Sequence, residues 1–371
     1  MGPLAVPVLA PLEVASRLAK LRARFEGAGI DGLVISNLTN VRYLSGFTGS
    51  AAVLAITSDA ALLTTDGRYR TQAAEQMAAA GTAGTIELEI GGVEAQRAAL
   101  GSLLANGAVG LEADSVTWNQ ATGWEERLGR SLVATSNLVE SLREVKDAGE
   151  IARMAHAAAI ADAALESVIG QIGSGLSEEA FALALDSAMR EFGAESSSFE
   201  TIVASGENSA KPHHHPGSRV IVPGDPVVLD FGATFEGYRS DMTRTVVVGG
   251  PPEGELAQIF EVVAAAQRAG AHAVRPGTSI ADVDATCRDL IGEAGYAERF
   301  EHSTGHGIGL DIHEMPWVSA QGTAILEPGV VVTVEPGVYV AGVGGVRIED
   351  TLVVTDDGAE PLTRFTKDFV A

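Results

Sequence analysis

The chain has 371 residues, of which 49 are acidic and 25 basic, so its formal net charge at pH 7 is −24. An acidic chain without a cluster of Lys or Arg binds a phosphate backbone poorly, which argues against a nucleic-acid partner. Hydrophobic residues make up 46% of the chain and charged residues 20%, a composition typical of globular rather than disordered proteins.

Length and segment composition narrow the class of protein further. A chain of this length is too long for one ordinary core and predicts two domains. Its one cysteine, Cys287, excludes an intramolecular disulfide, and no segment offers the ~20 uncharged apolar residues of a membrane span. Residues 1–11 contain Pro3, Pro7 and Pro11 and lack a basic start, so we expect a loose arm rather than a signal peptide. These features predict a soluble, cytoplasmic protein without a membrane partner.

The first part of the chain has the pattern of an α/β domain. Residues 12–26 place apolar side chains at helical spacing before the stop signals Gly27 and Gly29. Three short apolar runs then predict strands, at residues 33–35, 51–56 and 60–63. Strands that alternate with helical segments indicate an α/β domain, which we expect over residues 1–140.

The second part, residues 141–371, contains an internal repeat. It begins with the capping-box pattern Asp147-Ala148-Gly149-Glu150, which predicts a helix to about residue 168. The helical segment 175–193 recurs about 100 residues later as 277–295, and two acidic strand segments recur at a similar offset. Two such units of helices and an antiparallel hairpin would pack as pseudo-symmetric halves and bring their acidic residues together.

Four carboxylates lie in strand-like sequence among apolar neighbours: Asp230, Asp241, Glu335 and Glu349. A buried carboxylate costs several kcal/mol unless it is paired or binds a metal, and the chain offers too little nearby Lys or Arg to pair all four. Four carboxylates with one histidine form a hard, oxygen-rich ligand set. Such a set favours Mn²⁺, Co²⁺ or Zn²⁺ in a two-metal site over a thiolate-bound structural zinc.

Histidines cluster in the same part of the chain. Six of the eight fall in two short stretches, namely His213-His214-His215 and the group His302, His306 and His313. His214 and His215 could be solvent-exposed neighbours of a functional His213. Tyr238 and Trp317 flank the acidic and histidine motifs, where they could line a pocket or pack in the core.

These motifs resemble those of the pita-bread dinuclear metallopeptidases, and most of all the Xaa-Pro peptidases, prolidase and aminopeptidase P. The matching motifs in the second part are Asp230, Asp241, His302-Ser303-Thr304-Gly305-His306-Gly307-Ile308-Gly309, Glu335-Pro336-Gly337 and Arg347-Ile348-Glu349-Asp350. Those in the first part are Asn40-Val41-Arg42-Tyr43-Leu44-Ser45-Gly46-Phe47 and Thr65-Asp66-Gly67-Arg68-Tyr69. The resemblance implies a creatinase/prolidase-like α/β N-terminal domain. It is followed by an α+β pita-bread (creatinase/aminopeptidase-like) catalytic domain with a pseudo-two-fold repeat.

The resemblance implies five metal ligands. Asp230 would bind one ion, His306 and Glu335 would bind the second, and Asp241 and Glu349 would bridge both. Mn²⁺ is the metal that we expect, with Co²⁺ and Zn²⁺ as alternatives. Four carboxylate charges would offset two divalent ions.

Further residues take catalytic and substrate-binding roles by the same resemblance. His213, His313 and Glu335 would be catalytic, with Glu335 passing a proton to the leaving proline nitrogen. The substrate would contact His213, His302, His313 and Arg347, and Arg347 would either orient the carboxylates or receive a substrate carboxylate.

The implied activity is hydrolysis of the Xaa-Pro bond in dipeptides or at the N-terminus of short peptides, by a hydroxide that bridges two divalent ions. The resemblance also implies a homodimer. Sequence spacing does not distinguish a dipeptidase from an aminopeptidase P, so both activities remain alternatives. A methionine aminopeptidase-like enzyme would not explain the matched first domain. A non-catalytic peptide-binding protein on the same fold would not need a complete ligand set, which this chain has.

Overall fold

The computed structural model describes residues 2–368, and the chain divides into two compact units. The N-terminal unit is Pro11–Arg143, and the C-terminal unit runs from Glu144 onward and includes the arm up to Ala10. The division thus falls close to residue 140, where we expected a domain boundary, but the arm goes with the other unit.

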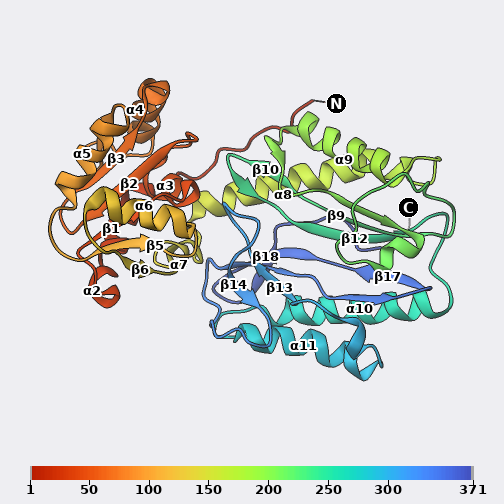
Figure 1. The fold of residues 1–371 in the computed structure, drawn as a ribbon. Coiled ribbons are helices and arrows are strands. Elements are labelled where there is room, and N and C mark those ends of the chain that lie inside the picture. The colour runs from red at the N-terminus through yellow and green to blue at the C-terminus, as the bar shows by residue number, and fades with distance from the viewer. Residues whose placement is uncertain (1, 369–371) are drawn as a thin grey trace. The chain divides into compact units, whose positions relative to one another are not determined.

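A six-stranded mixed sheet forms the centre of the N-terminal unit (Figure 1). Its strands, in sheet order, are β4 (Glu87–Ile90), β3 (Ala61–Thr65), β2 (Ala52–Thr57), β1 (Gly32–Ile35), β5 (Val109–Glu112) and β6 (Val133–Thr135). Its helices are α1 (Val14–Arg22), α2 (Phe25–Ala28), α3 (Leu38–Ser45), α4 (Arg70–Ala79), α5 (Val93–Leu103), α6 (Trp118–Leu128) and α7 (Glu140–Arg143). This arrangement confirms the predicted α/β fold.

The predicted elements of this unit agree with the structure, with one difference. The three apolar runs form β1, β2 and β3, and every residue of β1 and β3 is buried. The helix expected over residues 12–26 is broken into α1 and α2. Gly29 then ends α2 with φ 67°, a left-handed conformation that glycine adopts without strain.

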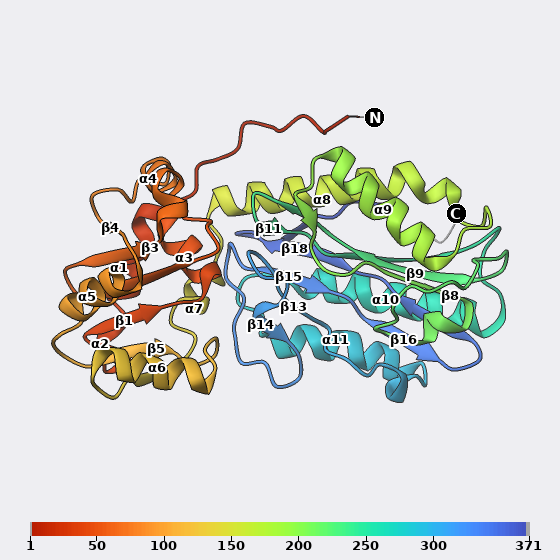
Figure 2. The same ribbon diagram turned by 45° about the horizontal axis from the view of Figure 1, so that its top comes forward.

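The C-terminal unit consists of two similar halves (Figure 2). The first half contains α8 (Ala148–Val168), α9 (Glu178–Phe192), β7 (Ser196–Ser197), β8 (Ile202–Ser205), β9 (Pro226–Phe231), β10 (Ala233–Phe235), β11 (Tyr238–Arg239) and β12 (Met242–Val247). The second half contains α10 (Gly254–Ala273), α11 (Ile280–Glu293), β13 (Gly305–Gly307), β14 (Glu314–Val318), β15 (Val331–Val334), β16 (Gly337–Val340), β17 (Gly344–Arg347), β18 (Asp350–Val354) and β19 (Ala359–Pro361). In both views α8 and α9 cover one side of the strands, and α10 and α11 cover the other.

Helix caps confirm the repeat that the sequence predicts. Asp147 caps α8 in a capping box with Glu150. Ser177 and Ser279 occupy the same position before α9 and α11, where each side chain accepts a hydrogen bond from a backbone N–H of the first turn. Each half also has its own buried cluster of apolar side chains between its helices and its strands.

The two hairpins of the halves are interrupted in the same way. β9 and β12 pair in one sheet, but their continuations β10 and β11 pair in another. β15 and β18 pair in a five-stranded sheet, whereas β16 and β17 form a separate two-stranded ladder. Asp241, Glu335 and Glu349 lie at these breaks, and Asp230 lies one residue from the end of β9. A break in a ladder redirects the side chains beside it, so all four carboxylates can leave the pleat of their sheets.

The N-terminal arm is irregular, as expected, but it is not loose. The Leu4 N–H donates to Phe192 O at 3.0 Å, and the half-buried side chains of Leu4 and Leu9 pack on the core of the first half. The arm therefore adds apolar side chains to the core of the first half.

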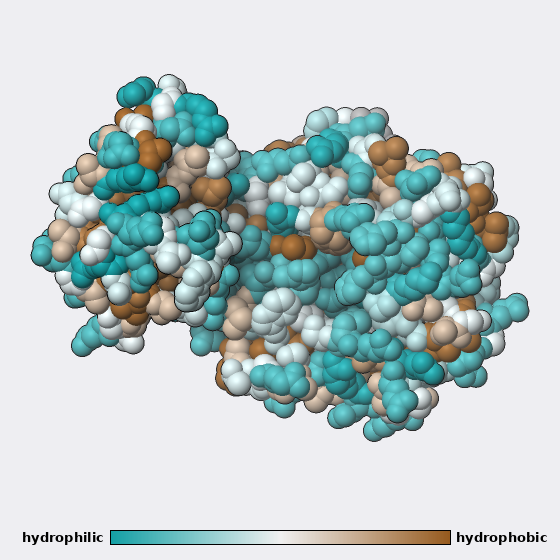
Figure 3. Space-filling view, in the orientation of Figure 1, coloured by the Kyte–Doolittle hydropathy of each residue, from teal (hydrophilic) through white to brown (hydrophobic). Residues whose placement is uncertain are grey.

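The surface is mostly hydrophilic, as the many charged residues of the sequence lead one to expect. Hydrophilic side chains predominate on the face in Figure 3, and apolar ones appear there in small scattered groups. Within residues 2–368, no helix combines the length and the apolar character that crossing a membrane requires.

Helix α9 offers a test of where the core of the first half lies. Phe181 is fully buried, whereas Leu183 on the same helix is 67% exposed. Phe181→Ala should lower the free energy of unfolding by about 3–5 kcal/mol, because it removes a large apolar side chain and leaves a cavity. Leu183→Ala, the matched control, should change it by less than about 0.5 kcal/mol. Urea unfolding of both variants measures the difference, and equal midpoints would contradict this description of the core.

Candidate metal centre

All nine residues to which the resemblance assigns a metal-binding, catalytic or substrate-binding role line one cavity of about 310 Å³ in the C-terminal unit. They come from both halves, and in the sequence they are up to 136 residues apart, from His213 to Glu349. The structure thus brings together every predicted site residue: Asp230, Asp241, His306, Glu335, Glu349, His213, His302, His313 and Arg347.

The acidic residues converge on His306. Asp241, His306 and Glu349 each offer one ligand atom, and these atoms all lie within 4.8 Å of one another. His306 Nε2 is 3.6 Å from Asp241 Oδ2 and 3.4 Å from Glu335 Oε1. Three carboxylates therefore surround a single ring nitrogen.

Strand pairing and hydroxyl groups fix the directions of these carboxylates. Asp230 pairs with Thr243 across β9 and β12. The Glu349 N–H donates to Thr243 O at 3.1 Å, while Thr243 Oγ1 donates to Glu349 Oε2 at 2.7 Å. In the second half, Thr333 Oγ1 donates to Glu335 Oε1 at 3.1 Å. Each threonine holds one carboxylate oxygen and leaves the other oxygen of that carboxylate free for a ligand.

Burial and mutual repulsion raise the pKa values of the carboxyl groups. Burial raises the pKa of Asp241 well above its usual range, and the nearby Glu349 carboxylate raises it further. The pKa of Glu349 is raised by the same causes, burial first and then Glu335. Burial also raises the pKa of Glu335 to about 8. The cluster therefore holds more negative charge than its protein surroundings stabilise.

Two observations show that divalent metal ions fit this donor set. Asp230 Oδ1 and Glu349 Oε1 are buried and have no hydrogen-bond partner, which is costly for carboxylate oxygens unless a cation satisfies them. His306 Nδ1 bonds to Gly307 O at 3.0 Å, and because a carbonyl only accepts, Nδ1 carries the hydrogen and Nε2 presents its lone pair to the carboxylates. Burial also lowers the pKa of His306, which keeps the ring neutral as a metal ligand must be.

Arg347 is fully committed to protein acceptors. It donates to Asp230 Oδ2 at 2.5 Å, to Tyr339 OH at 2.7 Å, to Thr243 Oγ1 at 3.1 Å and to Pro212 O at 3.2 Å. With its side chain 3% exposed, it has little freedom to receive a substrate carboxylate. Of its two expected roles, the structure favours the orientation of Asp230.

Tyr339 belongs to the site, and our reading of the sequence missed it. His302 Nδ1 bonds to Ser303 O at 2.8 Å, and burial lowers the pKa of His302 to about 4, so the ring is neutral with its hydrogen on Nδ1. His302 Nε2 therefore accepts from Tyr339 OH at 3.0 Å, and the same hydroxyl accepts from Arg347. The signal in the sequence was weak: Tyr339 follows Glu335-Pro336-Gly337 with alternate spacing.

The three consecutive histidines separate into three environments. His213 lines the cavity. His214 is not a solvent-exposed neighbour, because its Nε2 bonds at 2.8 Å to Glu178 Oε2, a buried carboxylate that also accepts from Ser205. His215 is 80% exposed, as expected, and lies 3.2 Å from Glu200. The His214–Glu178 contact anchors the loop that presents His213.

His313 and Trp317 close one side of the cavity. The His313 ring meets the His306 ring edge to face with centroids 4.5 Å apart, and it stacks on Trp317 at 6.0 Å. Of the two places expected for Trp317, a pocket wall or the core, the structure has it in the wall of this cavity. Tyr238 instead is buried and donates to Glu150 Oε1 at 3.0 Å, which is a structural role.

The raised carboxyl pKa values predict how metal-free protein responds to pH. Because the pKa of Glu335 in the folded state, about 8, exceeds the ordinary 4.5, protonation stabilises the folded chain, and this contribution is lost as pH rises through about 8. After chelation, the unfolding temperature should fall between about pH 6 and about pH 8.5, and Mn²⁺ should reduce the fall. Glu335→Gln should show a smaller fall without metal. A chelated protein whose unfolding temperature rises over this interval would contradict the pKa directions.

Both units match known protein families. Residues 152–356 match Metallopeptidase family M24, and residues 17–145 match the Creatinase/Prolidase N-terminal domain. An Xaa-Pro dipeptidase from Bacillus anthracis is 41% identical, with a TM-score of 0.92 over 96% of this chain and 99% of that one.

Two further solved structures are similar over most of the chain. The prolidase from Pyrococcus horikoshii is 32% identical, with a TM-score of 0.89 over 95% of this chain and 99% of that one. The X-Pro aminopeptidase from Thermotoga maritima is 35% identical, with a TM-score of 0.84 over 94% and 100%. These matches confirm the predicted fold class, and they show that the chain belongs to Metallopeptidase family M24, with a creatinase/prolidase-type domain before its catalytic domain.

Proposed function

We propose that this protein hydrolyses the Xaa-Pro bond of dipeptides with two divalent metal ions. The observation that carries the proposal is that four carboxylates, two buried and two partly buried, line one cavity of about 310 Å³ together with the neutral His306. Support for the substrate comes from the similar proteins of Bacillus anthracis and Pyrococcus horikoshii, which are named as an Xaa-Pro dipeptidase and a prolidase.

The five expected ligands divide between two ions. Asp230 would hold one ion, His306 and Glu335 the other, and Asp241 and Glu349 would bridge both. The free oxygens Asp230 Oδ1 and Glu349 Oε1 support this assignment. When bound, the ions would supply Lewis-acid polarisation of the scissile carbonyl and a hydroxide nucleophile at neutral pH. The oxygen-rich set favours Mn²⁺, with Co²⁺ or Zn²⁺ as alternatives.

The chain's own residues would move protons and stabilise charge around the reacting bond. Glu335, whose Oε1 accepts from Thr333, would carry a proton to the leaving proline nitrogen. His213 and His313 would donate to the oxygen that becomes negative in the transition state. Burial lowers the pKa of His313, so its ring is a neutral donor.

The remaining polar residues would hold the reacting groups in place. Arg347 donates to the Tyr339 hydroxyl, and this hydroxyl donates to His302. These two hydrogen bonds orient His302 at the wall of the cavity. Arg347 at the same time fixes Asp230. A homodimer stays a prediction from the resemblance, and a cytoplasmic location stays a prediction from the composition.

Aminopeptidase activity is the second candidate, because the Thermotoga maritima X-Pro aminopeptidase is 35% identical over nearly the whole chain. We favour the dipeptidase because the Bacillus anthracis structure has both the higher identity and the higher TM-score. The two activities differ in whether the site accepts a chain beyond proline.

Single substitutions separate metal binding from catalysis. Asp241→Ala or Glu349→Ala should abolish metal binding and activity together, because each carboxylate would bridge both ions. His313→Ala should keep the metal but lower kcat by ~10²-fold or more, because it removes a transition-state donor. Metal content and turnover of the three variants provide the measurements. Full activity in Asp241→Ala or Glu349→Ala would contradict the two-metal assignment.

A pair of substrates distinguishes the two candidate activities. With added Mn²⁺ the protein should cleave an Xaa-Pro dipeptide faster than the matching Xaa-Pro-Xaa tripeptide, and chelation should stop both reactions. Release of free proline and of the N-terminal residue are the readouts. Preference for the tripeptide would replace the dipeptidase by the aminopeptidase. If the metal-bound protein cleaves neither substrate, the proposed reaction is overturned.

A further inference from the structure

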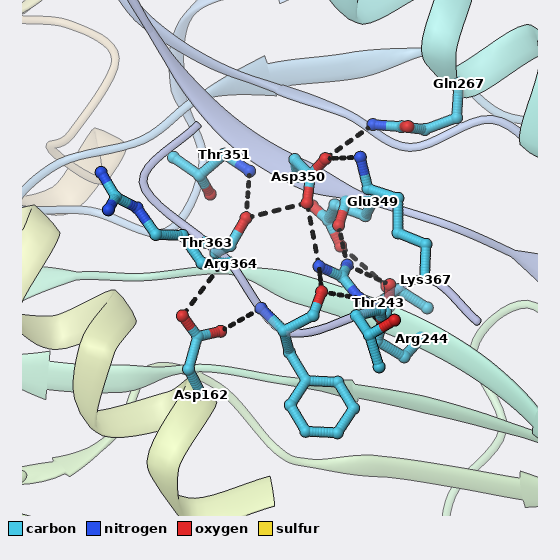
Figure 4. Close-up of polar contacts among 12 residues, drawn as sticks. Asp162, Thr243, Arg244, Gln267, Glu349, Asp350, Thr351, Thr363, Arg364 and Lys367 are labelled. Carbon is cyan, nitrogen blue, oxygen red and sulfur yellow. Dashed lines mark hydrogen bonds and ion pairs between the residues drawn. The ribbon is translucent and has the colours of Figure 1, made fainter. Parts of the chain in front are cut away.

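A second buried polar cluster lies next to Glu349 (Figure 4). Its centre is Arg244 on β12, which is 2% exposed. Residues 363–367, which we call the strap, follow β19 and pass beside this arginine. None of these residues is among the expected ligands or the cavity-lining side chains.

Arg244 uses its whole guanidinium group. Its Nε donates to Phe365 O at 3.1 Å and to Thr366 O at 3.0 Å, and Nη2 donates to Phe365 O at 2.7 Å and to Asp350 Oδ1 at 3.0 Å. Nη1 donates to Thr243 O at 3.0 Å and to Glu349 O. One side chain therefore joins β12, the Glu349-Asp350 pair and the strap.

Four side chains contact the carboxylate of Asp350. In addition to Arg244, its Oδ1 accepts from Thr363 Oγ1 at 3.1 Å, and its Oδ2 accepts from Gln267 on α10 at 3.0 Å. Lys367 of the strap forms an ion pair with the same Oδ2. Asp350 is 1% exposed, so the second half holds both ends of the strap at a fully satisfied buried carboxylate.

The strap also binds the first half. Asp162 on α8 accepts from the backbone N–H groups of Arg364 at 2.9 Å and of Phe365 at 3.0 Å. The Phe365 side chain packs, half-buried, on the core of the first half. The strap thus connects α8 of one half to Asp350 of the other, with Arg244 between them.

The cluster includes contacts with Glu349, one of the expected metal ligands. The backbone oxygen of Glu349 accepts from Arg244, its N–H donates to Thr243 O, and its Oε2 accepts from Thr243 Oγ1. We propose that Arg244 is a positioning residue for Glu349, and that the strap acts on metal affinity by holding Arg244. The inference rests on the proposed two-metal site.

The physical argument is preorganisation. A carboxylate that must bridge two ions has to be held in one place, and the groups that hold metal ligands commonly change affinity by 10- to 100-fold when removed. Arg244→Lys keeps a positive charge beside Asp350, but a single ammonium group cannot reach acceptors on Glu349 and on the strap at once. It should therefore weaken metal binding without leaving Asp350 unpaired.

The test is calorimetric titration of Mn²⁺ into chelated, dialysed protein. Arg244→Lys should lower the affinity by about 10- to 100-fold. Asp162→Ala, which releases two strap N–H groups and touches no metal ligand, should lower it by about 3- to 10-fold. Arg219→Lys is the matched control, because it removes a bidentate contact with Asp225 at 2.6 and 2.9 Å that does not reach the metal ligands. Arg153→Ala, which breaks the 2.8 Å ion pair with Glu236, is the control on α8.

Wild-type Mn²⁺ affinity in folded Arg244→Lys and Asp162→Ala would overturn the positioning role, as would an equal loss in the two controls. If Arg244→Lys does not fold, Asp162→Ala decides by itself. A wild-type protein that binds Mn²⁺ but cleaves no Xaa-Pro peptide would overturn the proposed reaction and leave this comparison of affinities valid. A wild-type protein that binds no divalent ion would overturn both.

Discussion

The structure depends on one electrostatic constraint: four carboxylates, two buried and two partly buried, lie together with too little positive charge around them. Among the residues that the structure describes, Arg347 is the one arginine or lysine in an ion pair with this cluster, through Asp230. Thr243 donates to one oxygen of Glu349, and Thr333 donates to one oxygen of Glu335. Asp230 Oδ1 and Glu349 Oε1 are buried without a hydrogen-bond donor. Such an arrangement is unfavourable for a protein by itself, because isolated buried carboxylates cost several kcal/mol each. It becomes favourable when divalent cations complete it.

The pseudo-symmetry of the C-terminal unit explains how the fold places these charges inside without losing its sheets. Each half carries a long hairpin that leaves its sheet partway, and the acidic residues occupy the points of departure. At those points close packing of the backbone is required: a Cβ on Gly232 would lie 1.9 Å from Ser240 O, and one on Gly305 would lie 2.0 Å from Thr333 O. Glycine is the residue that permits both contacts.

Much of this could be predicted from the sequence, and the exceptions share a cause. The capping box at Asp147, the repeated helices and the cluster around His306 all have local patterns, and the structure contains each of them. Arg244 was missed because its partners lie far along the chain, up to 122 residues away for Thr366, where no periodicity signals a contact. Tyr339 lies 8 residues from Arg347 and 37 from His302, and its only signal was the weak alternate spacing after Glu335. The docking of the N-terminal arm on Phe192 could not be predicted for the same reason, since it has no local pattern.

Two buried arginines show how the halves are joined. Arg244 belongs to the first half and binds Asp350 of the second, whereas Arg347 belongs to the second half and binds Asp230 of the first. Breaking a buried ion pair by removing one partner typically costs about 3–5 kcal/mol, so neither contact can open without a large penalty. Each arginine also holds the neighbourhood of one expected ligand, Glu349 for Arg244 and Asp230 for Arg347. The reciprocal pairs therefore set the separation of the two halves and, with it, the spacing between carboxylates contributed by different halves. A metal site built across a pseudo-symmetry axis needs such contacts, because neither half holds the complete ligand set by itself.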